Sequence, residues 1–244
     1  IALRKFSGLQ TSEVDGRFQI EAKAGASKSE LLKAFLKAKL EPAIFLAGIP
    51  GDVGGGVVMN AGIGEKITPR EFVEITDRIE VWRWSTPTTE ASDGAEEFKI
   101  ERLQFAAKDL SWSYRHCEGW RPGVITKVWL SWPMQPKADT LERVKTANQV
   151  RLSKQPLDMP SCGSVFVNPQ GTSAGRLVEA AGLKGWTVGG AKVSEKHANF
   201  IVNTGGATAR NIRDLIGEVK NRVYAHSGVE LKTEVILLGD WSDL

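Results

Sequence analysis

The sequence predicts an α+β protein that consists of two parts. Its first half combines a strand, an amphipathic helix and a glycine-rich segment with short runs of alternating apolar and polar residues, the pattern of a half-buried sheet. Its second half interleaves helical and strand-like segments without an internal repeat. Prolines at 133, 136, 156 and 160 bracket a predicted helix, ADTLERVKTANQVRLSK, that joins the halves. We therefore expect one domain over 1–133 and a second over 134–244.

The first part is predicted to open with a strand and a helix. FQIEAKAG alternates like a strand, and Ser27 with Glu30 then forms a capping box. Apolar residues at helical spacing follow: Leu31, Leu32, Phe35, Leu36 and Leu40. Next comes a segment in which seven of the seventeen residues from Gly48 to Gly64 are glycine. That density is too high for a regular helix or strand interior, so we expect a loop whose backbone closely approaches another group.

Short alternating runs between Phe72 and Trp132 predict a mixed or antiparallel sheet, with the polar stretch STPTTEASDGAEE as a loop. Six of the eight tryptophans lie in this region. Such a cluster can stack on a ligand, but half-buried sheet positions favour aromatic residues, so we favour core packing. The second part is predicted to contain a helix that Ser173 caps and Gly182 closes, and a longer helix from about Ala207 to His226. The last predicted strand is LKTEVILLG.

Composition excludes several classes of protein. The net charge is only +3, and Lys and Arg are interspersed with Asp and Glu, so we expect no nucleic-acid partner. No apolar run approaches the roughly 18 residues of a membrane span, and no leader opens the sequence. Cys117 and Cys162 fit neither a disulfide framework nor a zinc site, which indicates a cytoplasmic protein without a metal.

The glycine-rich segment is neither a P-loop nor a Rossmann fingerprint, because it lacks both the G-K-[ST] ending and the G-x-G-x-x-G spacing. It offers backbone N–H groups around Pro50 and a side-chain donor, Asn60, and such an arrangement favours a pyrophosphate. A structural turn packed against a sheet explains the same glycines equally well.

Two stretches carry a resemblance to a known family. LAGIPGDVGGGVVMNAG is very similar to the flavin-contacting signature of the UDP-N-acetylenolpyruvoylglucosamine reductases (MurB). The stretch from PSCGSVF to NTGGAT resembles their C-terminal substrate domain. The resemblance extends from the first strand to Gly239 and is weakest between Val81 and Lys108. It implies a FAD-binding domain of the PCMH or vanillyl-alcohol-oxidase type up to residue 133. The implied flavin contacts are Gly48, Ile49, Pro50, Gly51, Val53, Gly54, Gly55, Asn60 and Gly62.

The resemblance also implies an activity. NADPH would reduce FAD, and the reduced flavin would pass hydride to the enolpyruvyl double bond of a small-molecule UDP-sugar. The product, UDP-N-acetylmuramate, serves peptidoglycan synthesis and hence cell shape and division. We expect a monomer without a membrane partner. Two alternatives are another FAD-linked oxidoreductase of the same fold and a nucleotide-sugar-binding protein without catalysis.

Hydride addition leaves enolate character beside a carboxylate, so the site needs a cation or acid there and a proton donor at the adjoining carbon. By motif match these residues are Arg115 in YRHC, Ser164 in CGSVF and Glu234 in KTEV. From the residues alone, a surface salt bridge explains Arg115 and a turn hydroxyl explains Ser164. In the predicted last strand Glu234 shares a face with Ile236 and Leu238, where burial would raise its pKa. A glutamate on an edge strand that faces solvent explains the same pattern equally well.

Four further residues match positions that approach the nucleotide sugar in the family: Arg151 and Lys154 in RLSK, Asn168 in VFVNP and His197 in EKHAN. Basic residues in a loop suit a diphosphate, although a solvated loop charge is commoner. Two positions depart from the family pattern, since serine is frequent where Cys117 stands and lysine where Val167 stands. We expect the polarity of the site to differ there.

The start of the sequence also differs from the family. Ile1 runs at once into the apolar and basic stretch IALRKF, which resembles the interior of a protein. Family members carry another small flavin-binding subdomain before this point. We therefore expect upstream sequence to be missing and the 244-residue chain alone to hold FAD weakly.

Overall fold

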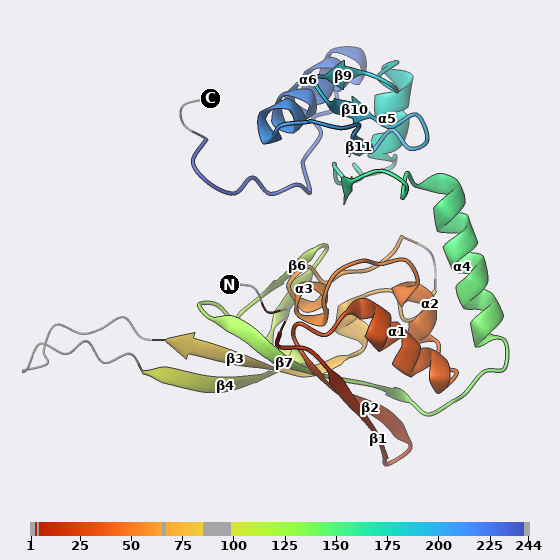
Figure 1. Cartoon of the computed structure of the whole chain (residues 1–244), viewed down its shortest axis with the longest axis vertical. Coiled ribbons are helices and arrows are strands. Elements are labelled where there is room, and N and C mark those ends of the chain that lie inside the picture. The colour runs from red at the N-terminus through yellow and green to blue at the C-terminus, as the bar shows by residue number, and fades with distance from the viewer. Residues whose placement is uncertain (1–2, 4, 65–66, 85–98, 242–244) are drawn as a thin grey trace, which may run out of the picture. The chain divides into compact units, whose positions relative to one another are not determined.

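The computed structural model describes residues 3, 5–64, 67–84 and 99–241, so the predicted loop at 85–97 lies outside the described residues. The chain forms two compact units, Ile1–Asn148 and Gln149–Leu244 (Figure 1). The division falls within helix α4 (Thr140–Lys154), which confirms the predicted connecting helix. Residue 133, where we expected the first domain to end, is the last residue of strand β7.

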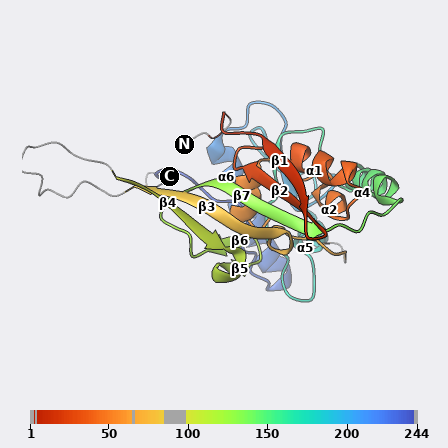
Figure 2. The same ribbon diagram turned by 90° about the horizontal axis from the view of Figure 1, so that it is seen from below.

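Unit 1 contains a five-stranded antiparallel sheet in the order β1-β2-β7-β3-β4 (Figure 2). The strands are β1 (Leu9–Val14), β2 (Arg17–Lys23), β3 (Thr76–Trp84), β4 (Ile100–Ala106) and β7 (Val124–Pro133). The predicted strand in FQIEAKAG is confirmed as β2, where Phe18, Ile20 and Ala22 are buried at a spacing of two.

Helices cover the face of the sheet that carries these buried side chains (Figure 1). They are α1 (Lys28–Lys37), α2 (Pro42–Leu46) and α3 (Val53–Val58), followed by the 3-10 turn η1 (Phe72–Glu74). The predicted capping box is present: the Ser27 side chain accepts from the Glu30 N–H, and the Glu30 carboxylate accepts from the Ser27 N–H. Leu31 and Phe35 on one side of α1 are fully buried in the core.

The glycine-rich segment contains helix α3, so the prediction that it holds no regular helix was wrong. A Cβ on Gly54 would lie 2.9 Å from the Ala24 Cβ, and a Cβ on Gly56 would overlap the Phe72 ring, with Cε2 2.7 Å away. The gain from seating the helix tightly against its neighbours offsets the low helix propensity of glycine, about 1 kcal/mol per residue.

The tryptophans of unit 1 have two kinds of surroundings. Trp120 is buried, and Trp112 and Trp132 pack against the core, as favoured from the sequence. Trp82 and Trp129 instead lie beneath guanidinium groups: Arg102 is 4.8 Å from the Trp82 centroid and Arg78 is 4.3 Å from the Trp129 centroid. Core packing therefore accounts for only part of the cluster. The small sheet of β5 (Ser111–Ser113) and β6 (His116–Glu118) completes the described strands of this unit.

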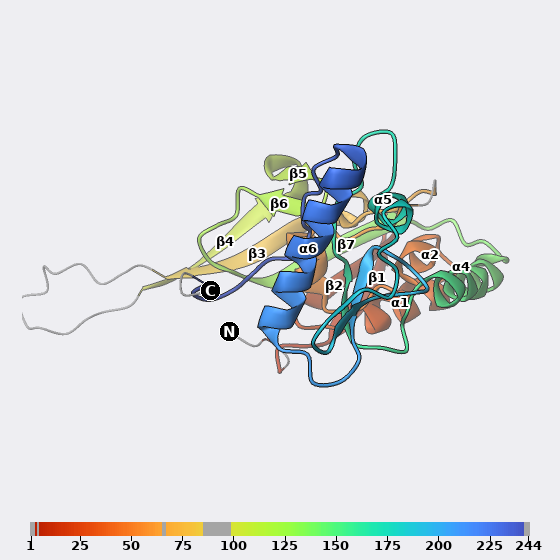
Figure 3. The same cartoon turned by 90° about the horizontal axis from the view of Figure 1, so that it is seen from above.

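Unit 2 is an α+β layer with an antiparallel sheet in the order β8-β11-β10-β9. Its elements are β8 (Ser161–Ser164), α5 (Ala174–Ala180), β9 (Thr187–Val188), β10 (Ala191–Val193), β11 (Phe200–Asn203) and α6 (Ala209–Ser227). Both predicted helices are confirmed, including the Ser173 cap of α5. The long helix α6, seen along its length in Figure 3, buries Leu215, Ile216 and Val219. Among the described residues, no helix is long and apolar enough to cross a membrane.

The predicted last strand, LKTEVILLG, is not a strand in the described structure. The segment forms one isolated bridge, between Phe166 and Thr233, and then leaves the sheet. Ile236 is 69% exposed and Leu238 is 83% exposed. The expectation that Glu234 shares a buried apolar face with them was therefore wrong, and Glu234 is only half-buried.

Candidate functional site

The glycine-rich segment of unit 1 is held against the connection between β2 and α1. Ser27 and Asp52 form an isolated bridge, and the N–H groups of Val53 and Gly54 donate to the carbonyls of Ala26 and Ala24, both at 2.8 Å. Two of the backbone donors that we expected to face a pyrophosphate are thus used inside the protein. The connection positions the Pro50–Gly51 turn, where Gly51 has a φ of +96°.

The glycines of this segment serve different purposes. Gly54 and Gly56 give room to Ala24 and Phe72, so their roles are internal. Gly55 lies between them in α3, is exposed, and a Cβ built on it would meet no described atom within 4 Å. Because alanine would favour this helix by about 0.5–1 kcal/mol, the fold itself gains nothing from glycine at Gly55. The open side of Gly55 therefore fits close approach by a group outside the fold.

Asn60 does not offer a donor to a ligand in this structure, contrary to our expectation. Its side chain is buried, and its Nδ2 donates to the Glu71 carboxylate at 3.1 Å and to the Ser113 carbonyl at 3.2 Å. Its Oδ1 accepts from the Val73 N–H at 3.0 Å. Both amide hydrogens are used, so Asn60 fastens the end of the glycine-rich segment to η1 and β5.

Lys28 was not among the site residues predicted from the sequence. Its backbone N–H donates to the Gly51 carbonyl and its Nζ donates to the Pro50 carbonyl, both at 2.9 Å, so one residue holds both sides of the turn. The side chain is 6% exposed, and burial lowers its pKa to about 8, against the opposing effect of Asp52 and with a smaller contribution from Arg115. The available signal was a lysine in the first turn of a helix, where the dipole disfavours a cation.

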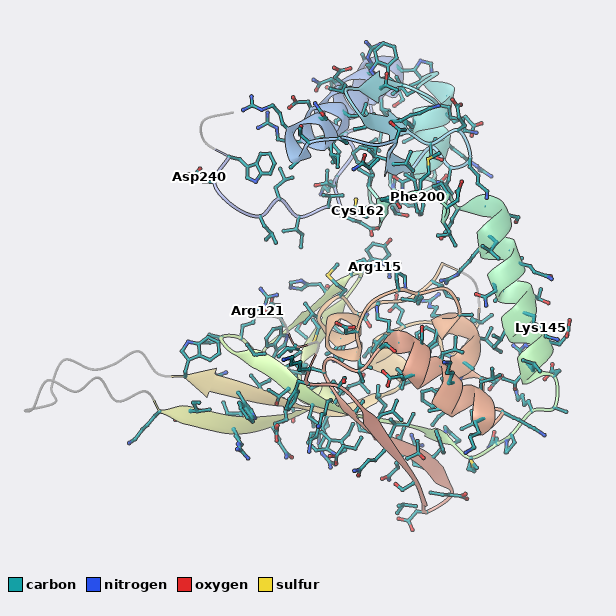
Figure 4. All side chains as sticks on the ribbon, in the orientation of Figure 1. Arg115, Arg121, Lys145, Cys162, Phe200 and Asp240 are labelled. Carbon is teal, nitrogen blue, oxygen red and sulfur yellow. The ribbon has the colours of Figure 1, made fainter. Side chains whose placement is uncertain are left out.

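Arg115 lies at the turn between β5 and β6 with a φ of +57° (Figure 4). Its Nη2 donates to the Gly62 carbonyl at 3.0 Å, and its guanidinium lies 4.6 Å from the Tyr114 ring centroid. This hydrogen bond joins Arg115 to the glycine-rich segment. Two predicted flavin contacts of the same segment, Pro50 and Gly51, accept hydrogen bonds from Lys28. Cys117, two residues further along, is fully buried, and burial raises the pKa of its thiol to about 11.

In unit 2, Ser164 ends strand β8 opposite Phe200 of β11. It is half-buried, and its hydroxyl makes no hydrogen bond to the described part of the chain, so it remains able to donate to a ligand. The next residue, Val165, accepts a backbone hydrogen bond of 2.8 Å from the Glu234 N–H. The fold therefore brings Ser164 and Glu234, far apart in sequence, onto adjoining stretches of backbone.

Asn199 is a second residue that the sequence did not single out, although it lies within the EKHAN motif. Its buried side-chain amide accepts from the Phe166 N–H at 2.9 Å and donates to the Phe166 carbonyl at 2.8 Å. Its carbonyl accepts from the Val165 N–H at 2.8 Å. These bonds fix the backbone that follows Ser164.

His197 lies beside Asn199 in the same unit. Its Nδ1 accepts from the Asn199 N–H at 3.2 Å, and its ring packs edge-on against Phe200 at a centroid distance of 4.9 Å. Burial lowers the pKa of His197, and the charge of Lys184 lowers it further. A neutral ring that accepts at Nδ1 carries its proton on Nε2, so His197 can act as a hydrogen-bond donor at that atom.

The other predicted substrate contacts are placed less directly. Arg151 and Lys154 lie in the last turn of α4 rather than in a loop, where cations suit the carboxyl end of the helix dipole. Asn168 uses its Oδ1 to accept from the Ala174 N–H at the start of α5, at 3.0 Å. Val167 is half-buried and donates its backbone N–H to the Lys232 carbonyl at 2.9 Å.

Comparisons with known proteins give a consistent result. Residues 155–238 match the model of the C-terminal domain of UDP-N-acetylenolpyruvoylglucosamine reductase. The chain is 38% identical to the UDP-N-acetylenolpyruvoylglucosamine reductase of Streptococcus pneumoniae strain Hungary19A-6, over 95% of this chain and 71% of that protein. For the reductase of strain ATCC 700669, the identity is 38% over 95% of this chain and 68% of that protein. The crystal structure of the Thermus caldophilus reductase (MurB) superposes with a TM-score of 0.65 at 33% identity, over 86% of this chain and 70% of that one.

Proposed function

Because this chain belongs to the UDP-N-acetylenolpyruvoylglucosamine reductase (MurB) family, we propose that it uses NADPH and FAD to reduce enolpyruvyl-UDP-N-acetylglucosamine to UDP-N-acetylmuramate. The reaction supplies a precursor of peptidoglycan and so supports cell-wall growth, cell shape and division. The observation that carries this proposal is the likeness to a reductase over 95% of the chain.

We propose that unit 1 is a FAD-binding domain of the PCMH type. The open side of Gly55 supports this proposal, because a Cβ built there would meet no described atom within 4 Å and the backbone is exposed to an approaching group. The Pro50–Gly51 turn, held by Lys28, lies at the beginning of the same segment. We assign Gly48, Ile49 and Gly62 to the same contact surface and give Val53, Gly54 and Asn60 internal roles.

The bound FAD would accept hydride from NADPH and supply it to the enolpyruvyl double bond. Arg115 would bind the substrate carboxylate, since a guanidinium matches its geometry with two parallel hydrogen bonds. Glu234 would act as the acid beside that carboxylate. Ser164 would donate the proton to the carbon adjoining the one that receives hydride, a role suited to a hydroxyl without a hydrogen-bond partner in the described structure.

The remaining predicted residues would hold the nucleotide sugar. His197 would donate its Nε2–H to an oxygen of the substrate, since its Nδ1 already accepts a hydrogen bond from Asn199. Arg151 and Lys154 would contribute positive charge toward the diphosphate. Asn168 would contribute its side-chain amide.

We further propose that the protein works as a monomer in the cytosol. The thiols of Cys117 and Cys162 are free, which is compatible with a reducing compartment. Light scattering of the purified protein would test its oligomeric state directly.

The absorbance of the flavin tests the proposed reaction. A yellow protein should bleach when NADPH is added without oxygen, and its colour should return with enolpyruvyl-UDP-N-acetylglucosamine and the release of UDP-N-acetylmuramate. Bleaching without recovery would instead favour another FAD-linked oxidoreductase. A protein that binds the UDP-sugar but no flavin would favour the binding protein without catalysis.

A further inference from the structure

Lys28 is a buried cation whose presence the fold alone does not explain. The residue is 6% exposed, yet its ammonium makes one hydrogen bond, to the Pro50 carbonyl, among the described residues. An ammonium has three donors, so two of them remain for a group outside the described chain. A methionine side chain of similar length could fill the same space without burying an unpaired polar group. Retaining a lysine here costs stability.

Charged and aromatic groups surround the ammonium of Lys28. Arg115 adds a second cation from the turn between β5 and β6, while Asp52 opposes both from the beginning of α3. The ring of Phe72 lies on another side, with its centroid 5.6 Å from Nζ. A Cβ on Gly51 would lie 3.7 Å from Nζ, so the ammonium sits directly against the Pro50–Gly51 turn. The buried ammonium therefore lies against the turn at which the flavin is proposed to bind.

Reduction of a flavin creates a charge that this arrangement can recognise. A hydride consists of two electrons and one proton, so a neutral oxidised flavin that accepts one becomes a monoanion. Protein charge near the reactive ring nitrogens tunes how readily a flavin is reduced. A buried cation acts strongly, because the surrounding protein screens it much less than water does.

We infer that Lys28 is a positioning residue for the cofactor, which holds the Pro50–Gly51 turn and places a positive charge that favours the anionic reduced flavin over the neutral oxidised flavin. This inference rests on the proposed function, since it requires that the segment bind FAD. The proposed function assigns flavin contacts to the turn, and this inference adds an effect of Lys28 on the midpoint potential of the bound flavin.

The test is the midpoint potential of the bound flavin in Lys28→Met, measured by dye equilibration at pH 7. Removal of the charge should make reduction less favourable by about tenfold, which corresponds to a fall of about 30 mV for a two-electron couple. Lys28→Arg keeps the charge and should restore most of the potential. Lys33→Met removes an exposed lysine from the same helix and is the matched control, with an unchanged potential expected.

The pH dependence of the wild-type potential gives an independent test that needs no variant. Hydride uptake alone brings one proton for two electrons, so the potential falls by about 30 mV per pH unit. Above pH 8, where Lys28 begins to lose its proton in the oxidised protein, reduction should bind a second proton and the slope should approach about 60 mV. Lys28→Met should keep the smaller slope throughout.

The outcomes separate the two proposals. An unchanged potential in Lys28→Met, together with a single slope in the wild type, would overturn the role of Lys28 while leaving the flavin enzyme intact. Full-length protein that binds no flavin would refute the proposed function itself. A lower potential and the loss of the steeper slope, with Lys33→Met unaffected, would establish the inference.

Discussion

Replacing Gly55 by alanine should stabilise the fold and weaken flavin binding, whereas the same change at the adjacent Gly56 should destabilise the fold. Both residues lie within α3, and neither has a φ in the left-handed region, so alanine fits the backbone at each. The difference arises from what the new methyl group meets. At Gly55 it meets no described atom within 4 Å, while at Gly56 it overlaps the ring of the fully buried Phe72.

The magnitudes follow from these contacts. Gly55→Ala should raise the free energy of unfolding by about 0.5–1 kcal/mol, the difference in helix propensity between the two residues. Gly56→Ala should lower it by about 1–3 kcal/mol, because Phe72 packs edge-on against Phe45 at a centroid distance of 6.1 Å and has little room to move. A methyl group between Gly55 and the flavin should cost about 1.4 kcal/mol or more of binding energy, which is about a tenfold loss of affinity.

Urea unfolding followed by tryptophan fluorescence measures the stability of both variants, and titration with FAD measures affinity. Trp120, buried in the core of unit 1, reports on the unit in which both substitutions lie. If Gly55→Ala bound flavin as tightly as the wild type, the open side of this glycine would have no role in cofactor binding. A Gly55→Ala variant less stable than the wild type would refute the reasoning about the fold itself.

Three further predictions concern single side chains. In Ser164→Ala, flavin reduction by NADPH should be unchanged, while stopped-flow reoxidation by the enolpyruvyl substrate should slow by about 10²–10⁴-fold; equal slowing of both steps would indicate a misplaced flavin. Asn199→Ala should lower stability by about 2–4 kcal/mol in urea, because the buried N–H and carbonyl of Phe166 lose their partners, with exposed Asn221→Ala as the neutral control. Lys28 has a pKa of about 8 when folded and 10.5 as its ordinary value, so the unfolded state binds more protons between these pH values. The stability of the wild type should therefore rise by up to about 3 kcal/mol from pH 8 to 10.5, and urea unfolding across this range should show no such rise in Lys28→Met.

Local structure in this protein was predictable from the sequence wherever neighbouring residues determine it. The capping box of Ser27 and Glu30 and the Ser173 cap act over three residues, and both begin helices as expected. Period-two burial likewise predicted β2. The family was predictable as well, because its two signatures are continuous stretches of sequence that match reductases along almost the whole chain.

The roles of individual site residues required the tertiary structure. Asn60 is engaged because its amide reaches Ser113, and Lys28 is buried because Pro50 and Phe72 close over its ammonium. Neither partner is a neighbour in the sequence, so neither periodicity nor motif spacing reveals it.

The same limit applies to the glycines of α3 and to the last predicted strand. The sequence gives the number of glycines, but only the packing distinguishes Gly56 from Gly55. A side chain at Gly56 would overlap the Phe72 ring, whereas a side chain at Gly55 would meet no described atom. Glu234 alternates with apolar residues as in a strand, yet its segment has a single bridge, at Thr233, and the exposed Ile236 follows. The sequence thus predicted the capped helices, strand β2 and the family, while burial and hydrogen-bond partners, which depend on distant segments, decided which side chains remain available for chemistry.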